Sequence, residues 1–284
     1  MSLVTSLELL TKAETGGYAV GAFNCNNMEI VQAIIAAAEA EQSPVIIQAS
    51  QGAIRYAGLG YITALVREAA LFSKVPVALH LDHGTDFKQV INCLRSGFTS
   101  VMFDGSQLPL EENIKITSKV VEVAHAVGVS VEGELGRLRG TEDEISVSER
   151  EAFLTDPKEA VTFVQETGVD ALAPSIGTAH GRYRGRPDLD FQRLKEIREL
   201  IRIPLVLHGS SGVPEEDIRR AIELGVRKVN IDTDIRVAFV DEMRRVLAAN
   251  PEEIDPRKVL GPARMRATEV IREKIRLFGS QGQA

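Results

Sequence analysis

Short, continuously apolar runs recur along the chain and alternate with segments whose apolar residues follow helical spacing. Such runs are typical of strands that are buried on both faces of a parallel sheet. The expected strands are Tyr18–Asn24, Pro44–Ala49, Pro76–Leu81, Ser100–Asp104, Ser130–Leu135, Ala171–Pro174, Pro204–His208 and Lys228–Ile231. The expected helices are Glu29–Glu41, Tyr61–Phe72, Asn113–Val127, Pro157–Thr167, Phe191–Leu200, Glu215–Leu224, Ile235–Ala249 and Pro256–Leu277.

Strands and helices that alternate in this way predict a closed α/β barrel, the (β/α)8 or TIM barrel. We expect one domain over residues 1–284, with the last two helices added after the eighth strand. An open, doubly wound sheet ranks second because it usually has fewer strands. Local signals agree with the predicted helices. For example, Asp156, Pro157 and Glu159 are typical of the start of a helix.

One connection departs from this pattern. Residues 136–155 form a long polar stretch, GRLRGTEDEISVSEREAFLT, between the fifth strand and its helix. Most such connections have about 2–6 residues, and longer ones are often functional lids. We therefore expect a lid with pivots at Gly136 and Gly140, and a surface insertion is the alternative.

Composition narrows the possible functions without changing the expected fold. The hydrophobic fraction is 44%, the charged fraction is 26% and the net charge is -7. This acidic balance disfavours nucleic acid as a partner, although backbone N–H groups could still bind phosphate locally. With two cysteines, no signal-peptide pattern and no apolar run near about 20 residues, we expect a cytoplasmic protein without a membrane span.

Polar side chains stand at or just after the end of nearly every predicted strand. Barrel enzymes place their catalytic groups at the carboxyl ends of the strands. The residues at these ends are Asn24, Ser50, Asp82, His83, Asp104, Glu132, Glu134, His180, His208, Asn230 and Asp232. Because buried strands rarely end this way by chance, we expect these side chains to share one site.

Three of the five histidines belong to this set. His83, His180 and His208 are distant in sequence but could meet at one barrel mouth. Three neutral imidazoles with an open fourth position are typical of a catalytic zinc site. The alternative for each histidine is a structural role with a hydrogen-bonded ring. Asp104 and Glu134 could be secondary metal ligands or hydrogen-bonded groups around the metal.

Two turns have the composition of a phosphate site. HGSSG at 208–212 follows the seventh strand, and NIDTD at 230–234 follows the eighth. Barrels often bind phosphate between these two loops, with backbone N–H groups and small hydroxyls. Gly177–Gly181 adds backbone donors beside His180. A phosphorylated small molecule is therefore the expected ligand.

These motifs together resemble the class II ketose-bisphosphate aldolases, and the resemblance covers essentially the whole chain. It is carried by HLDHG (80–84), TAHG (178–181), LHGSSG (207–212), NIDTD (230–234), GYAVGAFN (17–24), SVMFDGS (100–106) and VSVEGELGRLRGTEDE (129–144). The resemblance implies reversible, zinc-dependent cleavage of a ketose 1,6-bisphosphate. It also implies a monovalent cation, Na+ or K+, near the phosphate, and a homodimer or homotetramer.

The resemblance also implies roles for individual residues. His83, His180 and His208 would be the zinc ligands. Asp104 and Glu134 match a second or displaced metal site. Asp82 would deprotonate the C4 hydroxyl in cleavage, and Glu142 matches a mobile glutamate that moves the proton at C3 of dihydroxyacetone phosphate. The expected substrate-binding residues are Asn24, Ser50, Gly181, Gly209, Ser210, Ser211, Asn230, Ile231, Asp232, Thr233 and Arg236.

Fructose and tagatose 1,6-bisphosphates differ only at C4, so a few side chains must discriminate between them. Relatives specific for tagatose tend to have Ala where this chain has Asp232, and NIDTD followed by Arg236 resembles the fructose-specific branch. Asp232 could hydrogen-bond a substrate hydroxyl, and Arg236 could pair with the far phosphate. We predict cleavage of fructose 1,6-bisphosphate to dihydroxyacetone phosphate and glyceraldehyde 3-phosphate. Tagatose 1,6-bisphosphate is the alternative, because GTAHG and AFLTDPKEA are closer to that branch.

Two other functions have less support. A Schiff-base aldolase needs a lysine near a strand end. Lys74 precedes the third strand, and Lys228 opens the eighth. A non-catalytic sugar-phosphate-binding subunit would not need to retain every expected catalytic group.

Overall fold

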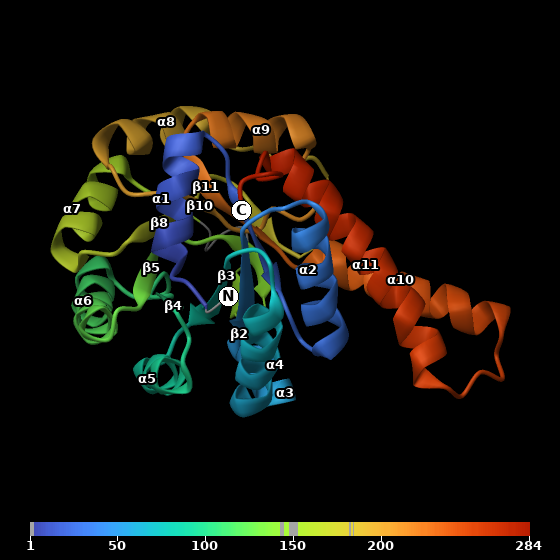
Figure 1. Cartoon of the computed structure of the whole chain (residues 1–284). Helices are drawn as coiled ribbons and strands as arrows, with labels where there is room; N and C mark the ends of the chain where they lie inside the picture. Colours follow the sequence, from blue (N-terminus) through green and yellow to red (C-terminus); the bar gives the residue numbers. More distant parts are fainter. Residues whose placement is uncertain (1–2, 143–144, 148–152, 182, 184) are drawn as a thin grey trace.

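Eight parallel strands close into a barrel in which the first strand pairs with the last (Figure 1). The computed structural model describes all residues except 1–2, 143–144, 148–152, 182 and 184. Around the barrel the strands are β1 (Val20–Asn24), β11 (Val226–Ile231), β10 (Leu205–Leu207), β8 (Ala171–Pro174), β5 (Ser130–Leu135), β4 (Ser100–Phe103), β3 (Val77–Gly84) and β2 (Val45–Ser50). The predicted TIM barrel is confirmed, and every predicted strand overlaps an observed one.

Closure of the barrel brings the two halves of the sequence together. Ala22 of β1 pairs with Asn230 of β11 on one side and with Ile46 of β2 on the other. β2 and β3 remain in register up to the pair Ser50 and Asp82. Because the strands run in one direction, their polar carboxyl ends meet at one mouth.

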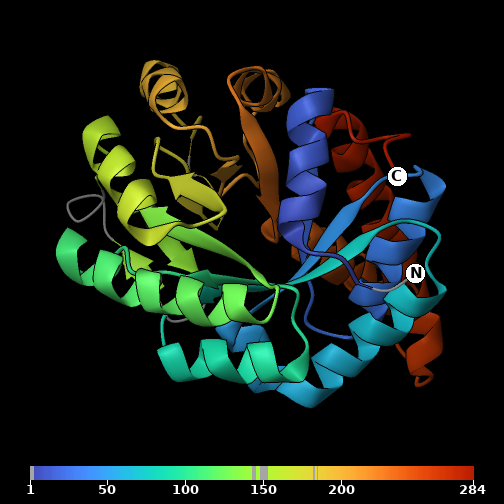
Figure 2. The ribbon, with the colours of Figure 1, turned by 60° about the vertical axis from the view of Figure 1, so that its left-hand side comes forward.

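Helices surround the barrel (Figure 2). The predicted helices are observed as α2 (Met28–Ala40), α4 (Leu59–Phe72), α6 (Leu110–Ala126), α7 (Pro157–Thr167), α8 (Phe191–Leu200), α9 (Glu215–Glu223), α10 (Thr233–Ala249) and α11 (Pro256–Phe278). α11 packs against both α10 and α2, so the added C-terminal helices lie beside the first βα unit. In the part of the chain that the structure describes, no helix is long and apolar enough to cross a membrane.

Three helices are additional to the prediction: α1 (Ser6–Gly16), α3 (Gln51–Ala57) and α5 (Phe87–Ser96). Each has a local start signal. Thr5 and Glu8 form a capping box at α1, and the Ser50 hydroxyl accepts the Ala53 N–H at α3. Asp86 caps α5 by accepting the Lys88 N–H. Sequence periodicity alone missed these helices, whereas their caps could have identified them.

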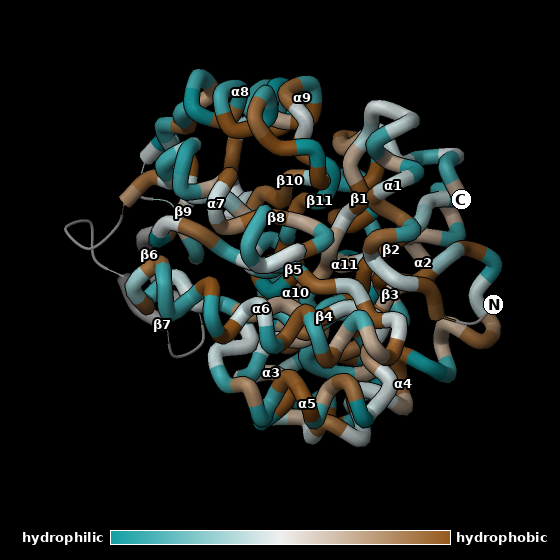
Figure 3. The backbone as a smooth tube through the Cα atoms, turned by 90° about the vertical axis from the view of Figure 1, so that its left-hand side faces the viewer, coloured by the Kyte–Doolittle hydropathy of each residue, from teal (hydrophilic) through white to brown (hydrophobic). Residues whose placement is uncertain are grey.

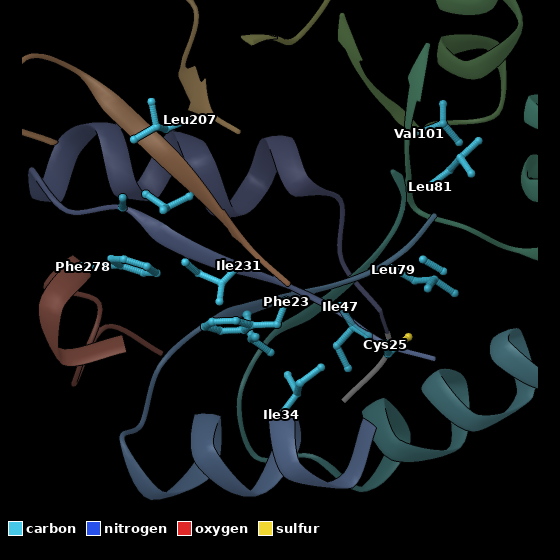
Figure 4. Close-up of a cluster of buried hydrophobic side chains, with 14 of the residues drawn as sticks. Phe23, Cys25, Ile34, Ile47, Leu79, Leu81, Val101, Leu207, Ile231 and Phe278 are labelled. Atoms are coloured by element: carbon cyan, nitrogen blue, oxygen red, sulfur yellow. The ribbon is translucent and has the colours of Figure 1, made fainter. Parts of the chain in front are cut away.

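Alternate residues of the strands face two separate apolar clusters. The outer cluster lies between strands and helices, where Phe23 and Ile47 lie close to Ile34 of α2 (Figure 4). The inner cluster fills one end of the barrel, where Ala22 and Ile46 pack with Leu9, Leu10 and Ala13 of α1, among others. This alternation follows from the two-residue period of a strand. Figure 3 shows hydrophobic segments at the barrel and mixed polarity along the surrounding helices.

The long connection after β5 contains two strands, which the sequence analysis did not expect. β6 (Arg139–Glu142) and β7 (Ile145–Val147) form an antiparallel hairpin, and β6 also pairs with β9 (Ala179–His180). Gly136 has φ 87°, which suits a pivot. Gly140 lies within β6 opposite His180, so a pivot at Gly140 would require this strand pair to separate. The backbone pairing of a strand opposes rotation there.

Candidate active site

Three histidines from separate elements meet at the carboxyl-terminal mouth of the barrel. His83 lies near the end of β3, His180 ends β9, and His208 directly follows β10. The ring centroids are 5.0 Å apart for His83 and His180, 4.7 Å for His83 and His208, and 6.2 Å for His180 and His208. One nitrogen of each ring lies within 4.8 Å of the others, so the group could hold a metal ion.

The backbone at His83 adopts an uncommon conformation. Its φ is 47°, in the left-handed region that side chains with a Cβ rarely occupy. The Gln51 side-chain amide donates to the His83 carbonyl over 2.7 Å and holds this backbone in place. Strained residues of this kind often mark functional sites, where the surrounding structure maintains them.

Carboxylates orient two of the imidazole rings. Asp104 Oδ2 lies 2.7 Å from His83 Nδ1, and Glu132 Oε1 lies 2.8 Å from His208 Nε2. The remaining nitrogens, His83 Nε2 and His208 Nδ1, face each other at 2.9 Å. A carboxylate that accepts the N–H of an imidazole leaves a lone pair on the other nitrogen. Two facing lone pairs suit a shared cation, so this donor set fits a metal.

Burial also favours the neutral ligand form of His208. Burial lowers its pKa, and the hydrogen bond with Glu132 opposes this shift in part. For Asp104, burial by itself would raise the pKa. The hydrogen bond and charge of His83, together with donors of Ser106, lower it to about 2. Asp104 is therefore an anion at neutral pH.

A second group of possible metal ligands overlaps the first. His83, Asp104 and Glu134 each offer a ligand atom within 4.8 Å of the others. Glu134 Oε2 lies 3.6 Å from His83 Nδ1 and 3.8 Å from His208 Nδ1. The two carboxylates are therefore adjacent to the three-histidine group, either as alternative ligands or as its hydrogen-bonding neighbours.

Asp82 is fully buried beside the histidines and is held by three amides. Its Oδ2 accepts from Asn24 at 2.8 Å and from Gln48 at 3.3 Å, and its Oδ1 accepts from Asn230 at 3.3 Å. Oδ1 also lies 4.0 Å from His83 Nε2. The carboxylate is thus fixed in orientation next to the possible metal position. The sequence analysis did not single out Gln48, although Gln48 is a polar residue in an otherwise apolar strand.

Below the histidines, Glu132 and Lys228 form a buried ion pair. Glu132 Oε2 lies 2.8 Å from Lys228 Nζ. Burial would raise the pKa of Glu132, but the Lys228 charge lowers it well below its usual range. Lys228 is the third residue of β11 and points into the barrel, so it does not open the strand as expected. Glu132 was noted only as polar, because the sequence did not reveal its partners.

The two turns expected to bind phosphate lie together beside His180. A cavity of about 930 Å³ lies next to them: Gly181, Ser211 and Gly212 line it on this side, and most of its other lining residues belong to α10 and α11. The Tyr183 hydroxyl accepts the Ala179 N–H at 2.7 Å and donates to the Gly209 carbonyl at 2.8 Å. A Cβ at Gly209 would lie 2.5 Å from the Ala179 carbonyl oxygen, so glycine is required there. The N-terminus of α10 begins at Thr233 and adds backbone donors.

Comparison with known proteins agrees with this geometry. The family described as class II fructose-bisphosphate aldolase matches residues 4–283. This chain belongs to that family. A fructose-bisphosphate aldolase of Thermus caldophilus is 50% identical over an aligned length of 305. The match covers 99% of this chain and 100% of that protein. A fructose-bisphosphate aldolase of Geobacillus stearothermophilus is 50% identical over 288 residues. The match covers 100% of this chain and 99% of that protein. The YdjI aldolase from Escherichia coli K12 has a TM-score of 0.87 and 34% identity, with 99% of both chains covered.

Among the expected substrate-binding residues of this member of the aldolase family, Gly181, Ser211 and Thr233 line the cavity. Asp232 and Arg236 pair with each other, with Oδ1 and Nε 2.7 Å apart. Ser210 donates to the Leu207 carbonyl, and Asn230 turns toward Asp82. The Ile231 side chain lies in the outer apolar cluster (Figure 4), so only its backbone can contact a ligand.

Two further expected residues of the aldolase site are Glu142 and Ser50. The backbone of Glu142 ends β6, but its side chain lies outside the described part of the structure. Ser50 caps α3, and its backbone pairs with Asp82 across the sheet. The hairpin that carries Glu142 pairs with the strand that carries His180, which connects the long β5 connection to the histidine group.

Proposed function

We propose that this aldolase cleaves fructose 1,6-bisphosphate reversibly to dihydroxyacetone phosphate and glyceraldehyde 3-phosphate, with zinc as its metal. The observation that carries the proposal is the pair of facing nitrogens of His83 and His208, each ring held by a carboxylate on its far side. His180 would complete the set of three ligands. Zinc prefers this nitrogen-rich set with an open position.

Zinc in this position would act as a Lewis acid toward the carbonyl and hydroxyl oxygens of the substrate. Asp104 and Glu134 would provide a second or displaced position for the metal. Asp82 would take the C4 hydroxyl proton in cleavage and return it to the aldehyde oxygen in condensation. Asn24, Gln48 and Asn230 orient its carboxylate, so little reorganisation is needed for the proton to move.

Glu142 would move the proton at C3 of dihydroxyacetone phosphate. The support is its place on the β6–β7 hairpin, which pairs with the His180 strand. We further propose that the hairpin closes over the substrate as a lid and excludes water. A monovalent cation, Na+ or K+, near the phosphate is also part of the proposal.

The phosphate of the dihydroxyacetone moiety would lie between the two turns beside the cavity. Gly181, Ser211 and Thr233 line that cavity and offer backbone N–H groups or hydroxyls. Gly209 and Ser210 lie in the same turn as Ser211 and would add backbone donors. Backbone groups of Ile231 and Asp232 would contribute from the end of β11, and Asn24 and Ser50 from the ends of β1 and β2.

Asp232 and Arg236 would select the substrate. Asp232 holds the Arg236 guanidinium by an ion pair, and the half-exposed arginine could turn to the far phosphate. The decisive experiment is turnover on fructose and tagatose 1,6-bisphosphates by the wild type and by Asp232→Ala. We expect the wild type to prefer fructose, and the substitution to reduce that preference by about tenfold or more, because a site built for a hydroxyl rejects the wrong epimer strongly.

Controls separate the alternatives. A wild-type preference for tagatose 1,6-bisphosphate would establish the alternative substrate, and unchanged discrimination in Asp232→Ala would exclude Asp232 as the selector. Turnover lost with a chelator and restored by zinc would argue against a non-catalytic binding subunit. Borohydride trapping of a substrate adduct would instead indicate a Schiff-base mechanism.

We also propose that residues 1–284 act as one domain and assemble as a homodimer or homotetramer. The pairing of β1 with β11 supports the single domain, since both ends of the chain build the barrel. Exposed Tyr61, Leu71 and Phe72 on α4 support assembly. Light scattering of the purified protein tests the oligomeric state, and a monomer at micromolar concentration would contradict it.

A further inference from the structure

The ion pair of Glu132 and Lys228 lies inside the barrel, directly behind one of the three histidines. Both side chains are buried, with side-chain exposures of 3% for Glu132 and 0% for Lys228. Glu132 comes from β5 and Lys228 from β11, two strands that are not neighbours in the barrel. The pair therefore spans the barrel interior, and Lys228 has no role in the proposed function above.

Each oxygen of Glu132 has its own partner. Oε1 lies 2.8 Å from His208 Nε2, and Oε2 lies 2.8 Å from Lys228 Nζ. Because Lys228 can only donate, Oε2 must be the acceptor of that bond. The carboxylate oxygen Oε1 accepts from the imidazole in the same way. This arrangement favours a proton on Nε2 of His208 and a lone pair on Nδ1, the nitrogen that faces His83.

Other polar groups complete the surroundings of the pair. His80 Nε2 lies 3.5 Å from Lys228 Nζ and 3.7 Å from Glu132 Oε2. His80 Nδ1 is in turn bonded to Ser100 Oγ at 2.7 Å. Burial and then the Lys228 charge lower the pKa of His80 well below its usual value, so His80 is neutral and can accept from Lys228. The ammonium is thus held on two sides, and it holds Glu132 in place.

We propose that Glu132 and Lys228 are positioning residues for the metal centre: Glu132 fixes the ring orientation and tautomer of His208, and Lys228 fixes Glu132. Carboxylates behind a metal-bound imidazole orient the ring and make it a stronger ligand. Asp104 stands in the same relation to His83. The inference rests on the proposed role of His208 as a zinc ligand.

The test uses Glu132→Gln, Lys228→Met and the double variant. Each single variant leaves one buried charge without its partner, and that loss is strongly destabilising. The double variant removes both charges at similar side-chain volume, so the metal-free protein should regain most of the lost thermal stability. Its affinity for zinc, measured by competition with a chromogenic chelator, should still be about 10–100-fold below wild type because His208 has lost its anionic partner.

A surface pair of the same kind provides the matched control. Asp170 Oδ2 lies 2.9 Å from His125 Nε2, and Asp170 directly precedes β8, so the pair lies at the amino ends of the strands, opposite the three histidines. Asp170→Asn should leave the zinc affinity unchanged. If the double variant binds zinc as tightly as wild type, the ion pair is only structural and the inference is wrong. If the wild type itself does not bind zinc, the proposed function fails instead.

A second measurement needs no variant. Nitrogen NMR of the zinc-loaded wild type, labelled with ¹⁵N-histidine, reports which ring nitrogen of His208 carries the proton. We expect the proton on Nε2 and the metal-shifted signal on Nδ1. A proton on Nδ1, or a metal-shifted Nε2, would overturn the inference even if the variants fail to fold.

Discussion

The two ends of the barrel interior are built by the same strands but have opposite chemistry. β3 contributes Ala78 to the apolar end and His83 to the mouth, and β10 contributes Val206 to the apolar end and is directly followed by His208 at the mouth. Leu9 and Leu10 of α1 pack into the apolar end. At the mouth, the buried side chains are histidines, carboxylates and amides that hydrogen-bond to one another.

Because of this difference, we expect the apolar end to contribute mainly to the stability of the barrel and the polar mouth mainly to catalysis. Burying apolar side chains such as Leu10 stabilises the fold by about 1.5–3 kcal/mol each. Burying the charges at the mouth is costly unless they are paired, and pairing them stabilises little overall. We therefore expect substitutions at the mouth that leave no buried charge unpaired to reduce activity much more than stability, and substitutions at the apolar end to have the opposite effect.

The largest effect should come from removing a proposed metal ligand at the mouth. His208→Ala should lower kcat/KM by on the order of 10³-fold or more, equivalent to about 4 kcal/mol, through loss of the metal's electrostatic stabilisation. Atomic absorption should find little zinc in the variant. Urea unfolding of the metal-free variant and metal-free wild type should be similar. A zinc-loaded variant with wild-type turnover would contradict the ligand assignment.

The second largest loss of activity should follow from removing the proposed acid–base group, Asp82. Asp82→Asn keeps the size of the side chain but removes its charge, and should lower kcat by about 10²–10⁴-fold. Unlike His208→Ala, this variant should retain its zinc, which separates proton transfer from metal binding. If kcat stays within twofold of wild type under saturating substrate, Asp82 is not the proton carrier.

At the apolar end, Leu10→Ala should destabilise the fold by about 2–5 kcal/mol, because it opens a cavity beneath the barrel. Urea denaturation measures the loss, and kcat of the folded fraction should not change. Leu7→Ala on the same helix is the control, because Leu7 is 38% exposed and should lose only about 0.5 kcal/mol or less. Equal losses in the two variants would show that α1 does not seal the barrel.

The smallest effect should come from Ser6→Ala, at the polar contact between α1 and the barrel. Ser6 Oγ lies 2.6 Å from Ser100 Oγ and 2.8 Å from Ser130 Oγ. Removing the hydroxyl should cost about 1 kcal/mol of stability. Ser100 also bonds His80, so a changed zinc affinity in Ser6→Ala would reveal coupling between the two ends. We expect no such change.

Much of this fold was predictable because its signals are local. Apolar runs and helical spacing depend on neighbouring residues, and they predicted all eight barrel strands. The hairpin within residues 139–147 was missed because β6 is polar and β7 has only 3 residues, which is too short for an apolar pattern to distinguish it from a loop. Gln48 was missed because a single amide in an apolar strand has no evident role until its partners, Asn24 and Asp82, are known.

The sequence by itself determined the order of strands and helices and the presence of polar residues where the strands end. Only the tertiary structure decided which carboxylate meets which histidine. Asp104 lies 21 residues from its partner His83, and Glu132 lies 76 residues from His208. The closure and register of the barrel bring these residues together, and a pattern of neighbouring residues does not contain that information. For the same reason Lys228, which was expected to open the eighth strand, lies in the barrel interior beneath the three histidines.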